Sequence, residues 1–191
     1  MPTDTARRGA AQGRRIVAAA LTAAPVIAGV LAAALASRST SQALSLLGLP
    51  DPGLLTTLGI PALTAAGEVC AAIAVGSLLL SAFVLPPQQA GVLDLDGYLA
   101  VRTAAAAMSA WAVCAVLLVP LTLSDASGRP VSEVAAQPAL FAAAVADVDT
   151  ASAWAATAVL AAVVAVFCRS ALTHAVAVSY THLTLPTSDL V

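Results

Sequence analysis

The chain has 191 residues, of which 60% are hydrophobic and 9% are charged, and its mean hydropathy is +0.95. Soluble domains contain roughly 45 to 50% apolar residues, so this composition excludes an ordinary soluble domain. The formal net charge of −2 results from ten acids and eight arginines without a lysine, and gives no reason to expect a nucleic-acid partner.

Residues 1–15 form a basic segment that contains four arginines. Together with the apolar run that follows, it could be read as a secretory signal peptide. The apolar core of a signal peptide has about 7 to 15 residues, whereas the run from residue 16 to 36 has 21. We therefore expect an uncleaved membrane anchor that follows a cytoplasmic tail.

Four apolar runs are long enough to cross a bilayer as helices. A helix rises 1.5 Å per residue, so about 20 apolar residues span the roughly 30 Å of hydrocarbon. The runs lie within the membrane region 16–177 and cover residues 16–36, 60–85, 103–123 and 151–168. The sequence therefore predicts an all-α integral membrane protein with a bundle of four transmembrane helices that contacts the lipid bilayer.

The distribution of arginines predicts the orientation of these helices. The cytoplasmic flanks of spanning helices carry an excess of positive charge. With the N-terminus in the cytoplasm, four alternating spans place six of the eight arginines inside, including Arg102 and Arg169, and leave Arg38 and Arg129 outside. We expect a multi-pass protein of the plasma (inner) membrane.

The second span contains a single acid, Glu68. An acid inside a spanning helix costs a few kcal/mol and is a functional hypothesis by default. Two structural alternatives remain open: the helix begins near Glu68 and leaves the acid at the wet interface, or the acid is protonated or paired with an arginine. The functional hypothesis is that Glu68 lines a path within the bundle that is reached from the external face.

The second and third spans each carry a cysteine, and the two lie at similar depths. Cys70 lies two residues beyond Glu68, and Cys114 lies nine residues before Leu123 at the outer end of its span. Thiolates select Cu(I), so Cys70 and Cys114 are candidate copper ligands, although a free cysteine is usually a small buried hydrophobe. At about 100° per residue, Met108 faces a different side of the helix from Cys114.

The segment between the third and fourth spans contains a stretch that is too short to cross the membrane. Residues 132–150 favour a short interfacial helix that Ser132 caps, with Asp147 and Asp149 at its wetter end. Trp154 is expected to anchor the outer end of the fourth span, and Trp111 is expected to pack within the third.

Signatures of soluble enzymes are absent from the sequence, including GxSxG, the P-loop and HExxH. We therefore expect no catalytic activity.

Residues 47–87 and 91–128 carry a family resemblance. They contain a PDPG loop, a GxP start of the second span, an AGE triplet and an LDxxGY inner loop. In combination these motifs resemble the N-terminal half of bacterial cytochrome c oxidase assembly proteins, in which a copper resistance protein D (CopD)-like region precedes a CtaG-like copper-chaperone region. The resemblance covers roughly residues 10–177. It implies copper handling or transport, with oxidase subunits or copper chaperones as partners.

A metal-free membrane scaffold is the alternative function. Small residues in 23–36 and 104–110 permit close approach of helices. The bundle could then dock partner subunits without binding metal. The loops rich in Met and His that would independently indicate copper are absent from this sequence.

The last segment, residues 178–191, differs from the Ala- and Val-rich chain before it. Its first part, "VSYTHLTLPT", resembles the translation of a transposase adapter used to build sequencing libraries. We expect a non-native tail, a natural protein that continues past Ala177, and hence a fragment. The alternative is a genuine tail whose alternating pattern forms an exposed strand.

Overall fold

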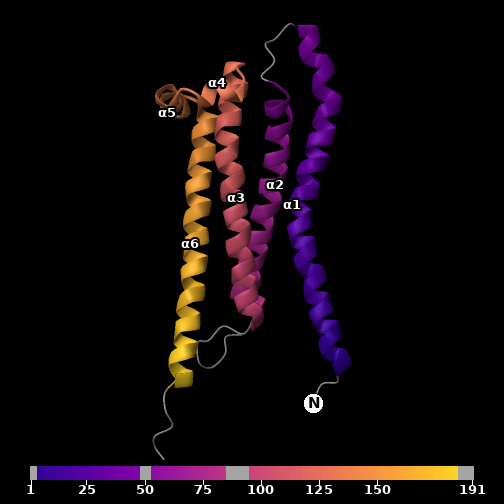
Figure 1. Cartoon of the computed structure of the whole chain (residues 1–191), viewed down its shortest axis with the longest axis vertical. Coiled ribbons are helices and arrows are strands. Elements are labelled where there is room, and N and C mark those ends of the chain that lie inside the picture. The colour runs from indigo at the N-terminus through magenta and orange to yellow at the C-terminus, as the bar shows by residue number, and fades with distance from the viewer. Residues whose placement is uncertain (1–3, 48–52, 85–94, 185–191) are drawn as a thin grey trace, which may run out of the picture.

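The computed structural model describes residues 4–47, 53–84 and 95–184, and the regular structure within them is helical. Four long helices run side by side, and two short ones lie together at one end of the bundle (Figure 1). The elements are α1 (Asp4–Leu47), α2 (Leu54–Leu79), the π-helical turn η1 (Leu80–Val84), α3 (Leu95–Ser127), α4 (Val131–Ala135), α5 (Pro138–Asp147) and α6 (Asp149–Thr184).

The first, third and fourth predicted spans each lie within one long helix. The second lies within α2 and the π-helical turn η1 that continues it, apart from Leu85, which is outside the described residues. The stretches that are long and apolar enough to cross a membrane are Gln12–Arg38, Leu54–Phe83, Asp96–Ser127 and Asp149–Ala171. The helices extend beyond the apolar runs, and the Ala, Arg and Gln residues in the flanks of α1 favour this because they are good helix formers. The prediction of an all-α fold with four candidate transmembrane helices is confirmed.

The central helix is α3. It packs against α2 on one side and α6 on another, whereas nearly all of the contacts of α1 are with α2. In the most apolar stretch of α3, 44% of the residues are buried, compared with 6% in α1. The helix α1 is therefore peripheral, and most of its apolar surface faces outward.

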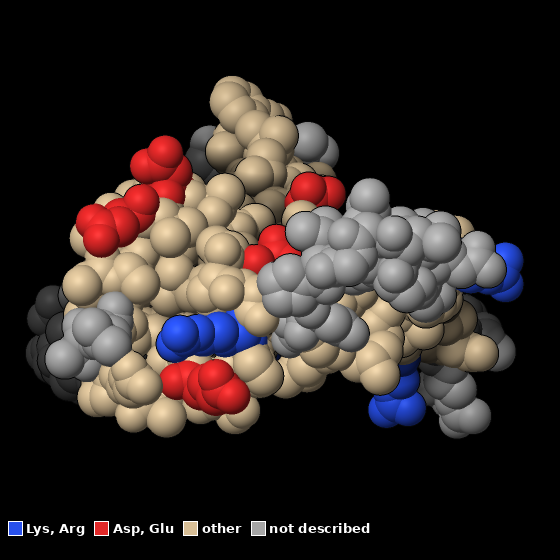
Figure 2. All heavy atoms as spheres, turned by 90° about the horizontal axis from the view of Figure 1, so that it is seen from above, with Lys and Arg blue, Asp and Glu red and all other residues tan. Residues whose placement is uncertain are grey.

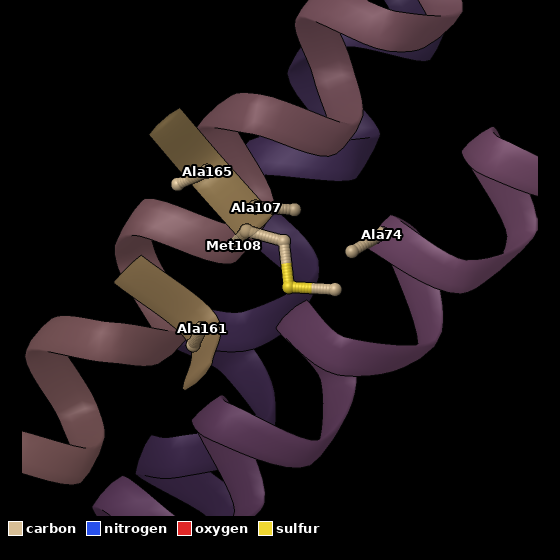
Figure 3. Close-up of a cluster of buried hydrophobic side chains, with 5 residues drawn as sticks. All are labelled: Ala74, Ala107, Met108, Ala161 and Ala165. Carbon is tan, nitrogen blue, oxygen red and sulfur yellow. The ribbon is translucent and has the colours of Figure 1, made fainter. Parts of the chain in front are cut away.

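Small side chains around one methionine form the middle of the bundle. Met108 of α3 extends toward Ala74 of α2, beside Ala161 and Ala165 of α6 (Figure 3). Alanines let the helix backbones approach closely, and the flexible methionine side chain fills the remaining space. The expectation that Met108 faces away from Cys114 agrees with this packing.

The helices α1 and α2 approach each other most closely at Gly29. A Cβ atom on Gly29 would lie 3.0 Å from the carbonyl oxygen of Ala62 and 3.6 Å from the Cβ of Ala66. Among the residues of α1 from 12 to 38, whose side chains are described, Gly29 is the one that is buried. A Cβ at this crossing would therefore be more tightly packed than an ordinary van der Waals contact.

The segment predicted to form one short interfacial helix contains two helices, α4 and α5. Pro130 precedes α4 and Pro138 begins α5, because proline has a fixed φ and no N–H and so suits the first helical turn. The predicted cap at Ser132 is wrong: Ser132 lies inside α4, and no side chain caps that helix. Asp149 begins α6 instead of ending the interfacial helix.

Both predicted terminal segments have helical backbone where the structure describes them. The basic segment 1–15 is part of α1 from Asp4 onward, and α6 continues to Thr184. Residues 181–184 are therefore helical rather than a strand. Residues 185–191 lie outside the described part of the chain.

Candidate functional site

A groove of about 390 Å³ lies between α1, α2 and α3. Pro25 of α1, Cys70 and Ile73 of α2, and Thr103 and Cys114 of α3 are among the residues that line it. Its walls are mainly apolar, so the chemistry of the groove depends on a few polar atoms.

The structure brings together the two predicted copper ligands, Cys70 and Cys114. Both line this groove. A Cβ on Gly67, one turn before Cys70, would lie 3.6 Å from the Cβ of Cys114. Cys70 is buried and Cys114 is half-buried, and both are free cysteines. The sequence predicted that the two cysteines lie at similar depths. The structure adds that they also face the same groove.

Helical spacing explains why these two cysteines share one face. Gly67, Cys70 and Ala74 are buried on the side of α2 that faces α3, at positions i, i+3 and i+7. On α3, Trp111 comes three residues before Cys114, and its Cδ1 atom lies 3.1 Å from where a Cβ on Gly67 would be. Trp111 therefore packs in the middle of the bundle, as expected, and Gly67 leaves room for the indole.

The hydroxyl groups at the groove bind to their own helices. Thr22 donates to the carbonyl oxygens of Ala18 and Ala19 at 3.2 and 3.0 Å. Thr103 donates to the carbonyl oxygen of Leu99 at 2.8 Å. Such bonds satisfy a hydroxyl within the helix. The soft metal-binding atoms among the residues that line the groove are the sulfur atoms of Cys70 and Cys114.

Glu68 does not line the groove. It is exposed on α2, and at about 100° per residue it is turned by roughly 160° from Cys70. Because α2 begins at Leu54, fourteen residues before Glu68, the alternative in which the helix begins near the acid is wrong. Glu68 lies about 21 Å along α2, near the middle of the span, and the structure does not bring it together with the cysteines.

Larger ligand clusters are absent from the described part of the chain. Among the residues whose side chains are described (12–38, 53–83, 96–138 and 141–171), no group of three or more His, Cys, Asp or Glu could hold a metal ion. Cys168 is buried on α6 and does not line the groove. The arrangement offers two thiols, which suits a soft cation with few ligands rather than a hard divalent ion.

A buried polar contact, which the sequence did not predict, joins the start of α2 to the end of α3. The Oγ1 atom of Thr56 and the Oγ atom of Ser124 are 2.8 Å apart, and both residues are fully buried. The Ser124 hydroxyl also contacts the carbonyl oxygen of Arg129 at 2.6 Å. This contact fixes the start of α2 against the end of α3.

A second pocket, of about 260 Å³, lies where α4 and α5 meet the end of α3. Arg129, Glu133 and Gln137 line it together with apolar residues such as Leu123 and Phe141. Acidic and basic side chains are interspersed on the described surface at this end (Figure 2). This pocket could not be predicted from the sequence, because it exists only once α4 and α5 fold back over the bundle.

Comparison of the chain with protein-family models, with curated protein sequences and with solved structures found no match. The fold defines the class: an all-α protein with four long apolar helices packed together, each a candidate transmembrane span. Such spans imply contact with a lipid bilayer.

Proposed function

We propose that the chain handles or transports copper at the bacterial plasma membrane, in a role linked to cytochrome c oxidase assembly. The observation that supports this proposal is the position of Cys70 and Cys114, which come from two different helices and line one groove. The motifs in residues 47–87 and 91–128 support it from the sequence side. Oxidase subunits or copper chaperones are the proposed partners.

Cu(I) is the proposed cargo because the groove supplies soft donors. Thiolates prefer Cu(I) over hard cations, and a ligating cysteine binds as the thiolate, so binding releases protons. The apolar walls contributed by α1 and by Ile73 and Ala107 limit the access of water to the two sulfur atoms.

The test is copper binding by the purified chain in detergent micelles under reducing conditions. We expect about one Cu(I) per chain and loss of this copper in the Cys70→Ala/Cys114→Ala double variant. Removal of a partner outside the ligand shell already weakens metal affinity about 10- to 100-fold, so removal of both ligands should cost at least as much. Cys168→Ala, which removes a buried thiol away from the groove, is the matched control.

The metal-free scaffold is the alternative, and the exposed face of α1 favours it. Ile16, Val30 and Leu35 are each more than half exposed and could pack against a partner subunit. Wild-type protein that retains no copper, or a double variant that retains as much as the Cys168→Ala control, would contradict the copper function and favour this alternative.

A further inference from the structure

The turn after α3 holds Arg129 in a fixed position at the second pocket. Gly128 has a φ of 64°, a conformation that favours glycine, and it follows the last residue of α3. The carbonyl oxygen of Arg129 then accepts a 2.6 Å hydrogen bond from the hydroxyl of Ser124. The backbone of Arg129 is therefore tied back to α3, and its side chain lines the pocket.

Backbone hydrogen bonds also fix the other two polar residues of this pocket, Glu133 and Gln137. The N–H of Glu133 donates to the carbonyl oxygen of Pro130 at 3.0 Å, at the start of α4. The N–H of Phe141 donates to the carbonyl oxygen of Gln137 at 2.9 Å, at the start of α5. The backbone around the pocket is thus ordered before a ligand arrives, which lowers the cost of binding.

The floor of the pocket is apolar. Leu123 of α3 is 3% exposed. The half-buried residues that line the pocket and pack against the cluster containing Leu123 are Val134, Phe141, Ala144 and Val148. A few polar groups over an apolar floor are typical of a site for a small molecule, and pockets for drug-sized ligands have about 300 to 1,000 Å³. A pocket of about 260 Å³ therefore fits a smaller ligand.

The rim of the pocket carries two opposite charges. Arg129 and Glu133 both line it, and both side chains are exposed. Within the described part of the chain, the structure gives neither side chain an ion pair or a hydrogen bond. A ligand with a single charge would be attracted by one of these groups and repelled by the other. The rim therefore favours a ligand that carries both charges.

We propose that this pocket binds a free α-amino acid with an apolar side chain. The guanidinium of Arg129 binds the carboxylate of the ligand, the carboxylate of Glu133 accepts hydrogen bonds from its ammonium group, and the apolar side chain of the ligand contacts the floor. The amide of Gln137 offers a further donor and acceptor at the rim. A zwitterionic phospholipid carries the same two charges, but its acyl chains are too large for a pocket of about 260 Å³.

This site is separate from the groove that contains the thiols. The two share no lining residue. The proposal is therefore independent of the copper function, and either can fail without the other.

Equilibrium dialysis of radiolabelled L-leucine against the full chain in detergent micelles tests the proposal. Two competitors each lack one charge of leucine: isocaproate has no ammonium group, and isoamylamine has no carboxylate. We expect each to bind about fivefold more weakly than leucine, which is the upper end of the range for exposed ion pairs.

Two variants should each remove one half of this selectivity. Arg129→Gln should bind leucine about fivefold more weakly and no better than isoamylamine. Glu133→Gln should bind leucine no better than isocaproate. The controls are Arg38→Gln and Asp96→Asn, which remove equal charges from exposed residues that do not line the pocket. Both should bind leucine as the wild type does.

Four results would overturn the proposal: no binding of leucine at millimolar concentration, equal binding of leucine and both competitors, unchanged binding in both rim variants, or an equal loss in the controls. Displacement of leucine by phosphatidylethanolamine in mixed micelles would also overturn it, because the site would then belong to a lipid headgroup. If one rim variant fails to fold, the other still decides the outcome.

Discussion

Gly29 is a residue at which one added methyl group should weaken the bundle. A Cβ there meets the backbone oxygen of Ala62 at 3.0 Å, and backbone atoms cannot move aside as a flexible side chain can. Overpacking typically costs about 1 to 3 kcal/mol. We therefore expect Gly29→Ala to lower the free energy of unfolding by this amount, measured by titration with sodium dodecyl sulfate in mixed micelles.

Gly76 offers the matched control for this substitution. It lies in α2, and nothing is within 4 Å of the position that its Cβ would occupy. Since alanine is favoured over glycine in a helix by about 1 kcal/mol, Gly76→Ala should leave stability unchanged or raise it. Equal losses in both variants would show that the α1–α2 crossing is not tightly packed.

Glu68 presents an acid on an exposed surface near the middle of a candidate span. A charged residue at the centre of a spanning helix raises the apparent free energy of insertion by about 2.5 to 3.5 kcal/mol. We expect Glu68→Leu to favour insertion of α2 by about 2 to 3 kcal/mol in a glycosylation-based insertion assay.

The control for Glu68→Leu is Ala72→Leu, which adds an apolar side chain at an exposed position one turn farther along α2. It should change insertion by only a few tenths of a kcal/mol. An insertion free energy that Glu68→Leu leaves unchanged would mean that the carboxyl group is already neutral or paired within the membrane.

At the scale of the elements, the contact between Thr56 and Ser124 should couple α2 to α3. A double-mutant cycle with Thr56→Val and Ser124→Ala is expected to give an interaction energy of about 0.5 to 2 kcal/mol. Unfolding in mixed micelles measures it. Thr157→Ala is the control, because the Thr157 hydroxyl bonds to Ala153 of its own helix at 2.9 Å. An interaction energy near zero would contradict the role assigned to the buried pair.

The four long helices could be predicted from the sequence because run length and hydropathy alone indicate a spanning helix. The packing faces could not, because these helices are apolar on nearly all sides and lack the periodic pattern that marks a buried stripe. This explains why the depths of Cys70 and Cys114 were predicted but the exposed position of Glu68 was not. The predicted Ser132 cap is wrong for a local reason, since Pro130, two residues before Ser132, occupies the position that precedes α4.

At the scale of the whole molecule, the orientation in the membrane remains a prediction from the arginines. Gln12 and Ser132 are exposed near opposite ends of the bundle. In a variant without the three native cysteines, a membrane-impermeant maleimide should label Ser132→Cys in intact cells and leave Gln12→Cys unlabelled. Broken cells, in which both sites react, provide the control. Labelling of Gln12→Cys alone in intact cells would reverse the topology.

The peripheral position of α1 links the assembly of the protein to the accessibility of its thiols. During synthesis α1 and α2 are made first, but the Met108 cluster can form only after α3 and α6 have entered the membrane. If α1 separated from α2 at Gly29, the three remaining helices would keep that cluster, but the groove would lose the wall that contains Pro25. The exposure of Cys70 and Cys114 to surrounding lipid therefore depends on a single helix–helix crossing.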